Sequence, residues 1–438
     1  MSLSTAVPVQ EPEWAAFVAM DWADRKHFWR LLPAGSQVSE QGELVNTPED
    51  VEEWAVRLRQ RFGGRPVAVC LEQSRGALVY MLTKYPHLVL FPVHPTMSAN
   101  YRKTFSPCGA KSDAGDTAAL LDLLLRHRDK LRCLQPDTAD TRLLHLLVEE
   151  RRQQVDERTA QSNRLRDCLK LYFPQILSWF EDVTTPLVGD LLVRWPALEK
   201  LQRANPAVLR RFFHQHNCRN ENLIDERIAA IYQAMAATSE EAVVEACMLK
   251  AQSLVALLAA LRSNIAGFDR RIEELVQSHP DASLFASFPG AGPVLVPRLI
   301  AAFGTRRDRF QNAVEMQTFS GIAPVKEASG NSEWIHFRFA CPKFLRQTFQ
   351  EFAGHSIGHS QWARAYYEHL RNDEKKEHHA AVRSLAYKWI RILFRCWKDG
   401  KLYDENIHLQ SLRRRSPLVT RLGWDAIAGF QKPSEKIS

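Results

Sequence analysis

The stretch RPVAVCLEQSRGALVYMLTKYPHLVLFPVHP, residues 65–95, decides the fold class of this chain. It begins with the apolar run VAVCL and ends with a second apolar run, LVLFPV, and both runs are typical of buried strands. The residues between them, GALVYMLTKYP, have the composition of a helix. A strand, a helix and a second strand in this order predict an α/β fold.

The sequence on both sides of this stretch extends the pattern. AAFVAMDWA (residues 15–23) and KHFWRLLPAG (residues 26–35) predict a buried strand and its hairpin partner. Residues 47–64 predict a helix, because they have a Thr N-cap, acids in the first turn and a Gly-Gly stop. Residues 113–131 predict another helix. We therefore expect residues 1–140 to form an α/β domain with a mixed sheet.

After residue 140 the strand signals disappear and two long helices are expected. Residues 141–173 and 239–279 carry apolar residues at spacings of three and four, and both run beyond the usual length of a globular helix. This pattern predicts a helical hairpin or coiled coil over residues 141–280, with dimerisation as one role. An intramolecular bundle fits the same pattern, and the sequence leaves both open.

The rest of the chain is expected to be mainly helical over residues 281–405. The stretch FPGAGPVLVPRLI looks like a helix-hairpin-helix element, in which Gly290 and Gly292 let a phosphate approach the start of the next helix. A plain Gly-Pro turn is the alternative. Pro297 is expected to kink the second helix. Residues 406–438, with three arginines in a row, are expected to form a loosely attached basic tail.

Composition favours a nucleic-acid partner. The 438 residues carry a formal net charge of +8, although a moderately basic soluble protein without such a partner has a similar charge. Eight cysteines without a C-x-x-C pair fit a reducing compartment. The sequence has no signal-peptide features and no stretch of eighteen uncharged apolar residues that would span a membrane. We expect a bacterial-type cytoplasmic protein that acts at the nucleoid.

Four carboxylates lie next to apolar segments, where the burial of an acid calls for an explanation. Asp21 and Glu72 each end an apolar run, and Asp113 and Asp116 are three residues apart at the start of a helix. If they converge on one sheet edge, their repulsion favours hard divalent cations, and two Mg²⁺ ions about 4 Å apart suit phosphodiester chemistry. The alternative is that Asp113 is a plain N-cap and Asp116 a first-turn acid.

A serine and several basic residues are further candidates. Ser329 lies in EASGNSEW, where a Ser-Gly pair alone indicates only a turn. The basic residues at 388, 391, 395 and 398 step by three, four and three, which predicts one basic helix face for RNA or DNA; a solvated surface stripe is the alternative. The candidate phosphate-binding residues are Arg102, Lys103, Lys388, Arg391, Arg395 and Lys398.

Several segments carry a resemblance to a known family. MDWADRKH, CLEQSRGALVYML and KSDAGDTAALLDLL resemble the DEDD transposases of bacterial insertion sequences, the IS-one-ten and Piv invertase group. The segment from SFPGAGPVLVPRLI to FLRQTF is similar to that family's second domain. The resemblance covers most of the chain, with a helical linker between the two parts. It implies a RuvC-like N-terminal domain with a ribonuclease H fold and a C-terminal domain that bears a serine.

The resemblance also implies roles for single residues. Asp21, Glu72, Asp113 and Asp116 match the DEDD acids, which hold Mg²⁺, with Mn²⁺ as a substitute. Ser329 matches the serine that forms a covalent phosphoserine link to DNA.

The resemblance implies an activity and an assembly. The chain would be a DNA recombinase that excises and inserts an insertion-sequence element. A structured non-coding bridge RNA would pair with the donor and target DNA. Dimers would pair into tetramers, with composite active sites to which the acidic domain of one protomer and the serine domain of another contribute.

One departure and two other functions stay open. Ala340 and Cys341 stand where the family has Gly-Asn, so Ser332 and Ser320 compete with Ser329 as the nucleophile. A RuvC-like metal-dependent nuclease would use the acids without a covalent intermediate. A non-catalytic nucleic-acid scaffold would need neither the acids nor the serine.

Overall fold

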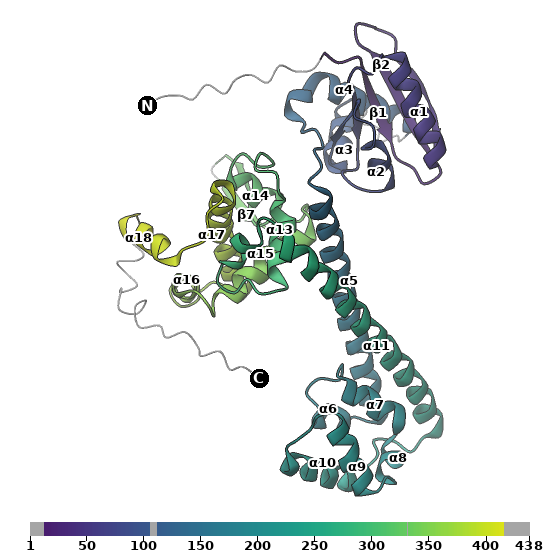
Figure 1. Cartoon of the computed structure of the whole chain (residues 1–438), viewed down its shortest axis with the longest axis vertical. Helices are drawn as coiled ribbons and strands as arrows, with labels where there is room; N and C mark the ends of the chain where they lie inside the picture. The colour runs from purple at the N-terminus through teal and green to yellow at the C-terminus, as the bar shows by residue number, and fades with distance from the viewer. Residues whose placement is uncertain (1–12, 106–111, 331, 416–438) are drawn as a thin grey trace. The chain divides into compact units, whose positions relative to one another are not determined.

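The computed structural model describes residues 13–105, 112–330 and 332–415. The chain divides into two compact units, Met1–Pro136 and Asp137–Ser438 (Figure 1). Each unit has its own apolar core and is described by itself.

A five-stranded mixed sheet forms the centre of the described part of the first unit. The strand order is β3-β2-β1-β4-β5; β1 pairs antiparallel with β2, and β2 with β3, whereas β1, β4 and β5 run parallel. This arrangement confirms the predicted α/β class with a mixed sheet. The strands are β1 (Ala16–Asp21), β2 (Lys26–Pro33), β3 (Glu40–Val45), β4 (Val67–Leu71) and β5 (Leu88–Pro92).

Helices cover both faces of this sheet because alternate strand residues point to opposite sides. On one face Val18 and Val69 share a core with α1 (Pro48–Arg61) and α2 (Ala77–Leu82). On the other face Ala19 and Cys70 pack with α4 (Asp113–His127), and α3 (Pro95–Phe105) packs against α4. Helix α1 begins where Thr47 accepts a hydrogen bond from the N–H of Asp50, as its sequence predicts.

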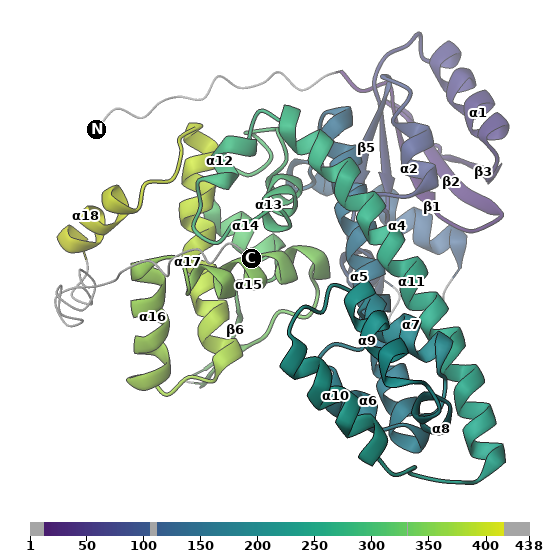
Figure 2. The same ribbon diagram turned by 60° about the horizontal axis from the view of Figure 1, so that its bottom comes forward.

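Two long helices, α5 (Ala139–Tyr172) and α11 (Glu241–Ser278), run side by side in the second unit (Figures 1 and 2). Leu144 of α5 shares a core with Ile272 of α11, whereas Leu165 shares a second core with Leu254. The pair is therefore an antiparallel hairpin within one chain. Dimerisation through these helices stays a prediction.

Helix α11 also has the length and composition of a membrane-spanning helix, with an 18-residue window of mean hydropathy 1.6. Length and composition are weak evidence for a membrane span, because helices of soluble proteins meet the same criteria. In this chain α11 packs along α5.

Five shorter helices connect the two long ones and enclose the second core, which includes Phe173, Phe213 and Ile224. Prolines begin two of them rather than break them, because Thr185 and Asn205 cap helices whose first residue is proline. The five are α6 (Gln175–Trp179), α7 (Pro186–Arg194), α8 (Leu198–Gln202), α9 (Pro206–Gln215) and α10 (Glu221–Gln233).

A C-terminal helical bundle packs around α17, whose Trp389 and Trp397 are fully buried. A two-stranded hairpin, β6 and β7, extends from this bundle. Its elements are α12 (Ala282–Ala286), α13 (Leu295–Phe303), α14 (Ala313–Phe319), β6 (Val325–Ser329), β7 (Ser332–His336), α15 (Lys343–Ser356), α16 (Gln361–Asn372), α17 (His378–Asp399) and α18 (Glu405–Arg415).

The structure differs from two of the predictions for this region. The prediction that Pro297 kinks its helix is wrong, because α13 begins at Leu295 and the first turn of a helix needs no N–H donor at its third residue. The start of the predicted basic tail forms helix α18, and residues 416–438 lie outside the described residues.

Candidate active-site residues

Asp21 and Glu72 lie next to each other at one edge of the sheet. Asp21 is the last residue of β1, and Glu72 directly follows β4. These strands are parallel neighbours, and Met20 is paired with Leu71, so the two acids occupy the next register position. Neighbouring strands are about 4.8 Å apart. Ala19 and Cys70, two residues before Asp21 and Glu72, pack against α4. Because strand side chains alternate between the two faces of a sheet, both acids lie on the face that α4 covers.

Asp113 and Asp116 lie in the first turn of α4 but differ in environment. The side chain of Ser112 caps the helix by accepting a hydrogen bond from the N–H of Gly115 at 3.2 Å, so the alternative that Asp113 is the N-cap is wrong. Asp113 is the first helical residue and is exposed. Asp116 is only 4% exposed and forms an ion pair with Arg102 of α3.

Arg102 lies among three of the four acids. Its hydrogen bond to Asp116 raises the pKa of the Arg102 guanidinium, and the charges of Asp116, Glu72 and Asp21 raise it further, against the lowering effect of burial. Asp116 thus contacts this guanidinium directly, whereas Glu72 and Asp21 act on it through their charges. Arg102 is predicted from the sequence as a phosphate-binding residue, and here its partner is a carboxylate. The neighbouring Lys103 is exposed.

A hard divalent cation fits this donor set in its chemistry. Such ions prefer carboxylate oxygens, and the positive charge of Arg102 lies where the three acids favour a cation. In residues 13–105, 112–330 and 332–415, however, no three His, Cys, Asp or Glu side chains are close enough together to hold a metal ion.

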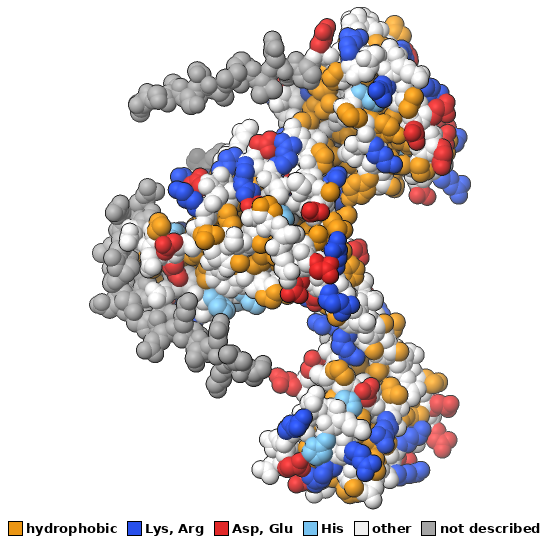
Figure 3. Space-filling view, in the orientation of Figure 1, with side chains coloured by type: hydrophobic (Ala, Val, Ile, Leu, Met, Phe, Trp, Pro, Cys, Tyr) orange, Lys and Arg blue, Asp and Glu red, His pale blue; other side chains and the backbone are white. Residues whose placement is uncertain are grey.

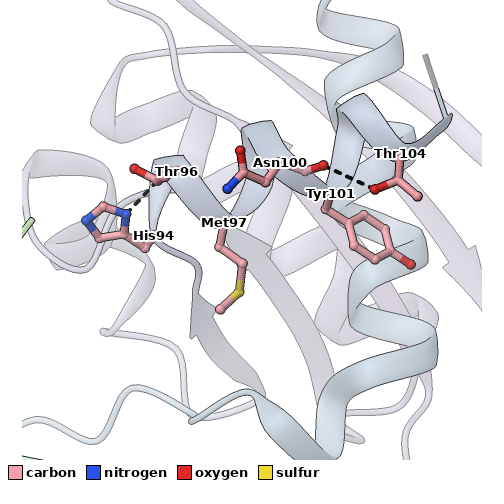
Figure 4. Close-up of a pocket in the computed structure, with 6 residues that line it drawn as sticks. All are labelled: His94, Thr96, Met97, Asn100, Tyr101 and Thr104. Atoms are coloured by element: carbon pink, nitrogen blue, oxygen red, sulfur yellow. Dashed lines mark hydrogen bonds between the residues drawn. The ribbon is translucent and has the colours of Figure 1, made fainter. Parts of the chain in front are cut away.

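A shallow hollow lies along helix α3, which also carries Arg102 (Figure 4). Sequence reasoning did not identify this surface, because its residues follow no motif. Nδ1 of His94 accepts the N–H of Thr96 at 3.2 Å, and the hydroxyl of Thr104 donates to the carbonyl of Asn100 at 3.2 Å. The hydroxyl of Tyr101 donates to Asp122 at 2.7 Å, which ties α3 to α4.

Ser329 is the last residue of β6 and is exposed at the end of the hairpin. It pairs directly with Ser332 of β7, and Gly330, with φ of +58°, supplies the left-handed backbone that the turn needs. Directly paired residues share a face, so the two serines are neighbours and Ser332 remains an alternative nucleophile. Ser320 is fully buried and donates to the carbonyl of Gln317, which argues against it.

Two ion pairs hold the hairpin that carries Ser329. His336 contacts Glu327 at 3.0 Å, and Lys326 contacts Glu333 at 2.6 Å. The hydrogen bond to Glu327 raises the pKa of the exposed His336. Three large apolar side chains nearby are left in solvent: Trp334 is 56% exposed, Ile335 67% and Phe339 78%.

The segment that departs from the family pattern packs at the base of this hairpin. Gly321 has φ of +74°, and a Cβ there would collide with the side chain of Cys341. Nη1 of Arg346 lies 3.4 Å from the Cys341 sulfur and donates to the carbonyl of Arg338 at 3.2 Å. Cys341 thus has a structural role beside Gly321, whereas Ala340 is exposed.

The two glycines of the predicted helix-hairpin-helix element differ. Gly290 has φ of +78°, and a Cβ there would lie 3.0 Å from the backbone carbon of His355, so this glycine serves close packing against α15. Gly292 has open space around it. Phosphate binding by either glycine stays a prediction.

The predicted basic face of α17 is exposed, opposite the buried Leu385, Trp389 and Leu393. Lys and Arg side chains gather on the bundle near α14 and α17 in Figure 3. Some of this charge already has protein partners. Arg395 pairs with Asp399 at 2.5 Å, Lys398 donates to the carbonyl of Arg307 at 2.6 Å, and Lys388 lies over the ring of Tyr366. Arg391 is exposed on the same face.

Comparison with known proteins relates both units to transposases. A family model described as a transposase matches residues 18–174, which include the four acids. A second, described as the transposase IS116/IS110/IS902 family, matches residues 282–368, which include Ser329. The two matches together cover more than half of the chain.

Curated relatives match along almost their whole length. The chain is 26% identical to a proposed mini-circle transposase for IS117 from Streptomyces coelicolor, over 90% of this chain and 97% of the relative. It is 25% identical to an uncharacterized protein of insertion element IS110 from the same organism, over 89% and 96%. It is 26% identical to an uncharacterized protein of insertion element IS900 from Mycobacterium paratuberculosis, over 87% and 89%.

Proposed function

Because the chain belongs to the IS116/IS110/IS902 family of transposases, we propose that it excises and inserts an insertion-sequence element through a covalent serine–DNA link. The observation that carries the proposal is geometric: Asp21 and Glu72 occupy neighbouring register positions on the sheet face that α4 covers, and Asp116 of α4 pairs with Arg102. A site that concentrates negative charge in this way favours the binding of cations, and phosphodiester chemistry uses bound divalent cations.

The proposed metal ligands are Asp21, Glu72 and Asp116, with Asp113 completing the set from the exposed start of α4. Two Mg²⁺ ions, or Mn²⁺ in their place, would polarise the scissile phosphate and stabilise the leaving oxygen. Arg102 pairs with Asp116, and its positive charge offsets part of the negative charge of Glu72 and Asp21.

The proposed nucleophile is the hydroxyl of Ser329, which is exposed at the end of its hairpin. Its oxygen attacks the phosphorus, an O–P bond forms, and the bond from phosphorus to the sugar oxygen breaks. The serine loses its proton and the departing sugar oxygen gains one. Attack of another strand's sugar hydroxyl on the phosphoserine reverses these changes. The strands are thus rejoined without ATP, because a phosphodiester replaces a phosphodiester.

Guidance and assembly are parts of the same proposal. A bridge RNA that pairs with donor and target DNA is supported by the family and by the net charge of +8. The acids and Ser329 belong to different units of the chain, which is compatible with composite sites in dimers that pair into tetramers. The protein would act at the bacterial nucleoid in the cytoplasm.

A covalent-capture experiment tests the proposed function. Wild-type protein, the element's non-coding RNA and labelled junction DNA are incubated with Mg²⁺, denatured and separated on a gel. We expect an adduct that is absent in Ser329→Ala and Asp21→Asn but present in Ser320→Ala. An adduct lost only in Ser332→Ala would identify Ser332, on the other strand of the hairpin, as the nucleophile. Nicked DNA that persists in Ser329→Ala but vanishes in Asp21→Asn would identify a metal nuclease and contradict the proposal.

A further inference from the structure

Two arginines lie over one aromatic ring at the base of the serine hairpin, and a third directly follows that aromatic residue in the chain. The guanidinium carbons of Arg346 and Arg383 lie 4.5 Å and 4.3 Å from the ring centroid of Phe337. Arg338 directly follows this phenylalanine in the chain. These three residues, called the arginine cluster below, come from the segment after β7, from α15 and from α17.

The charges of the arginine cluster are not neutralised within the part of the chain that the structure describes. Arg338 donates to the carbonyl of Ala323 at 3.3 Å, and Arg346 to that of Arg338 at 3.2 Å. Neither contact involves a carboxylate. The Nε of Arg383 is buried and has no hydrogen-bond partner among the described residues. Burial lowers the pKa of Arg383, and the neighbouring charge of Arg346 lowers it further.

Two other buried or half-buried arginines of this unit are balanced by acids. Arg298 pairs with Glu351, and Arg307 pairs with Asp281 although it also lies over the ring of Trp397. The arginine cluster differs from these two because the like charges of Arg346 and Arg383 are held together without an acid. Holding like charges close costs free energy, which an anion between them would recover. The planar guanidinium matches the oxygens of a phosphate in a bidentate way.

The length of the hairpin sets the distance from the arginine cluster to Ser329. Ser329 and Ser332 are paired at one end, and Val325 and His336 at the other, just before Phe337. Four strand residues separate these ends, which is about 14 Å at 3.4 Å per residue.

We propose that Arg346 and Arg383, with Arg338 next to them in the chain, bind a backbone phosphate of the DNA strand that the serine attacks, about 14 Å along the hairpin from Ser329. That this strand is the one attacked rests on the proposed function, but binding of the phosphate does not. The arginine cluster would fix the register of the strand on the hairpin, because phosphate contacts position a nucleic acid without reading its sequence.

Binding is measured with full-length protein that carries Ser329→Ala, in EDTA, so that no chemistry contributes. Fluorescence anisotropy follows a labelled DNA duplex of arbitrary sequence and, separately, a labelled RNA hairpin over a range of salt concentrations. Arg346→Gln and Arg383→Gln are each expected to weaken DNA binding and to reduce the slope of log K against log salt by about 1. Arg271→Gln is the matched control, because Arg271 is exposed and already paired with Glu274.

Thermal melting of each variant separates loss of a contact from loss of the fold. Arg346→Lys gives a second comparison, because it keeps the charge but not the planar fork, and we expect it to retain the salt slope and part of the affinity. An unchanged slope for DNA in folded Arg346→Gln and Arg383→Gln, or a loss confined to RNA, overturns the proposal. Failure of the covalent-capture experiment leaves this binding result unaffected, so the two proposals fail independently.

Discussion

Arg102 pairs with Asp116, so its removal leaves this buried carboxylate without its counterion and takes away a positive charge that also acts on Glu72 and Asp21. We expect Arg102→Ala to lower the free energy of unfolding by about 2 kcal/mol without divalent ions, because Asp116 is almost fully buried. Mg²⁺ is expected to raise the melting temperature of this variant more than that of the wild type.

Differential scanning fluorimetry with and without Mg²⁺ measures both effects. Lys103→Ala on the same helix is the control, because Lys103 is exposed. Equal melting temperatures for wild type and Arg102→Ala in EDTA would show that the guanidinium does not hold the acids together.

The residues of the acid site differ in how far the sequence predicted them. Asp21 and Glu72 follow apolar runs, so their position at a strand end could be predicted from the local pattern alone. The position of Arg102 depends on how α3 packs against α4, a tertiary contact that leaves no local signal. The alternative in which Asp113 caps α4 was wrong because Ser112 is the N-cap, and Ser and Asp are about equally good N-caps.

Glu351 of α15 joins three helices, since it accepts hydrogen bonds from Arg298 of α13 and from Arg152 of α5, the latter at 3.0 Å. Glu351→Ala would leave Arg298, which is 4% exposed, without its counterion. We expect a loss of about 3 kcal/mol in the free energy of unfolding, measured by urea denaturation. Glu368→Ala, an exposed acid on α16, is expected to change stability by less than about 0.5 kcal/mol.

His408 makes the docking of α18 sensitive to pH. Burial against Trp362, with a smaller contribution from the charge of Lys388, lowers the pKa of His408 to about 4. The unfolded chain, with a histidine pKa near 6.5, therefore binds more protons between pH 6.5 and pH 4, and folding loses stability as pH falls through this window.

We expect faster amide hydrogen exchange in α18 at pH 5 than at pH 7, after correction for intrinsic exchange rates. The change should be much smaller in His408→Gln, which cannot gain a proton. Equal pH dependence in both proteins would assign the effect to another group.

Hydrophobic pattern predicted the buried strands, and the exposed strands that it missed have a physical cause. Strands β1, β4 and β5 are buried and apolar, so periodicity identified them, whereas β3 is mostly exposed and polar and was not predicted. The hairpin β6–β7 is exposed on nearly every residue, and its sequence, VKEASGNSEWIH, has no apolar face. Its stability comes from pairing across the strands and from ion pairs, which single-strand periodicity does not detect.

At the scale of the whole molecule, the two units have separate cores and should unfold as separate transitions in calorimetry. Arg102→Ala is expected to lower one transition temperature and Glu351→Ala the other. Their effects should add in the double variant, because the residues lie in different units. A single transition that both variants shift together would show that the units unfold as one.

The antiparallel pair of α5 and α11 constrains how the gene can change length. A helix of 34 residues extends about 51 Å, and each inserted residue turns everything beyond it by about 100°. A single codon gained in either helix would rotate its apolar stripe away from its neighbour along the remaining length. Insertions in this part of the gene are therefore tolerated only as matched additions of whole turns in both helices, whereas the loops between the shorter helices can vary one codon at a time.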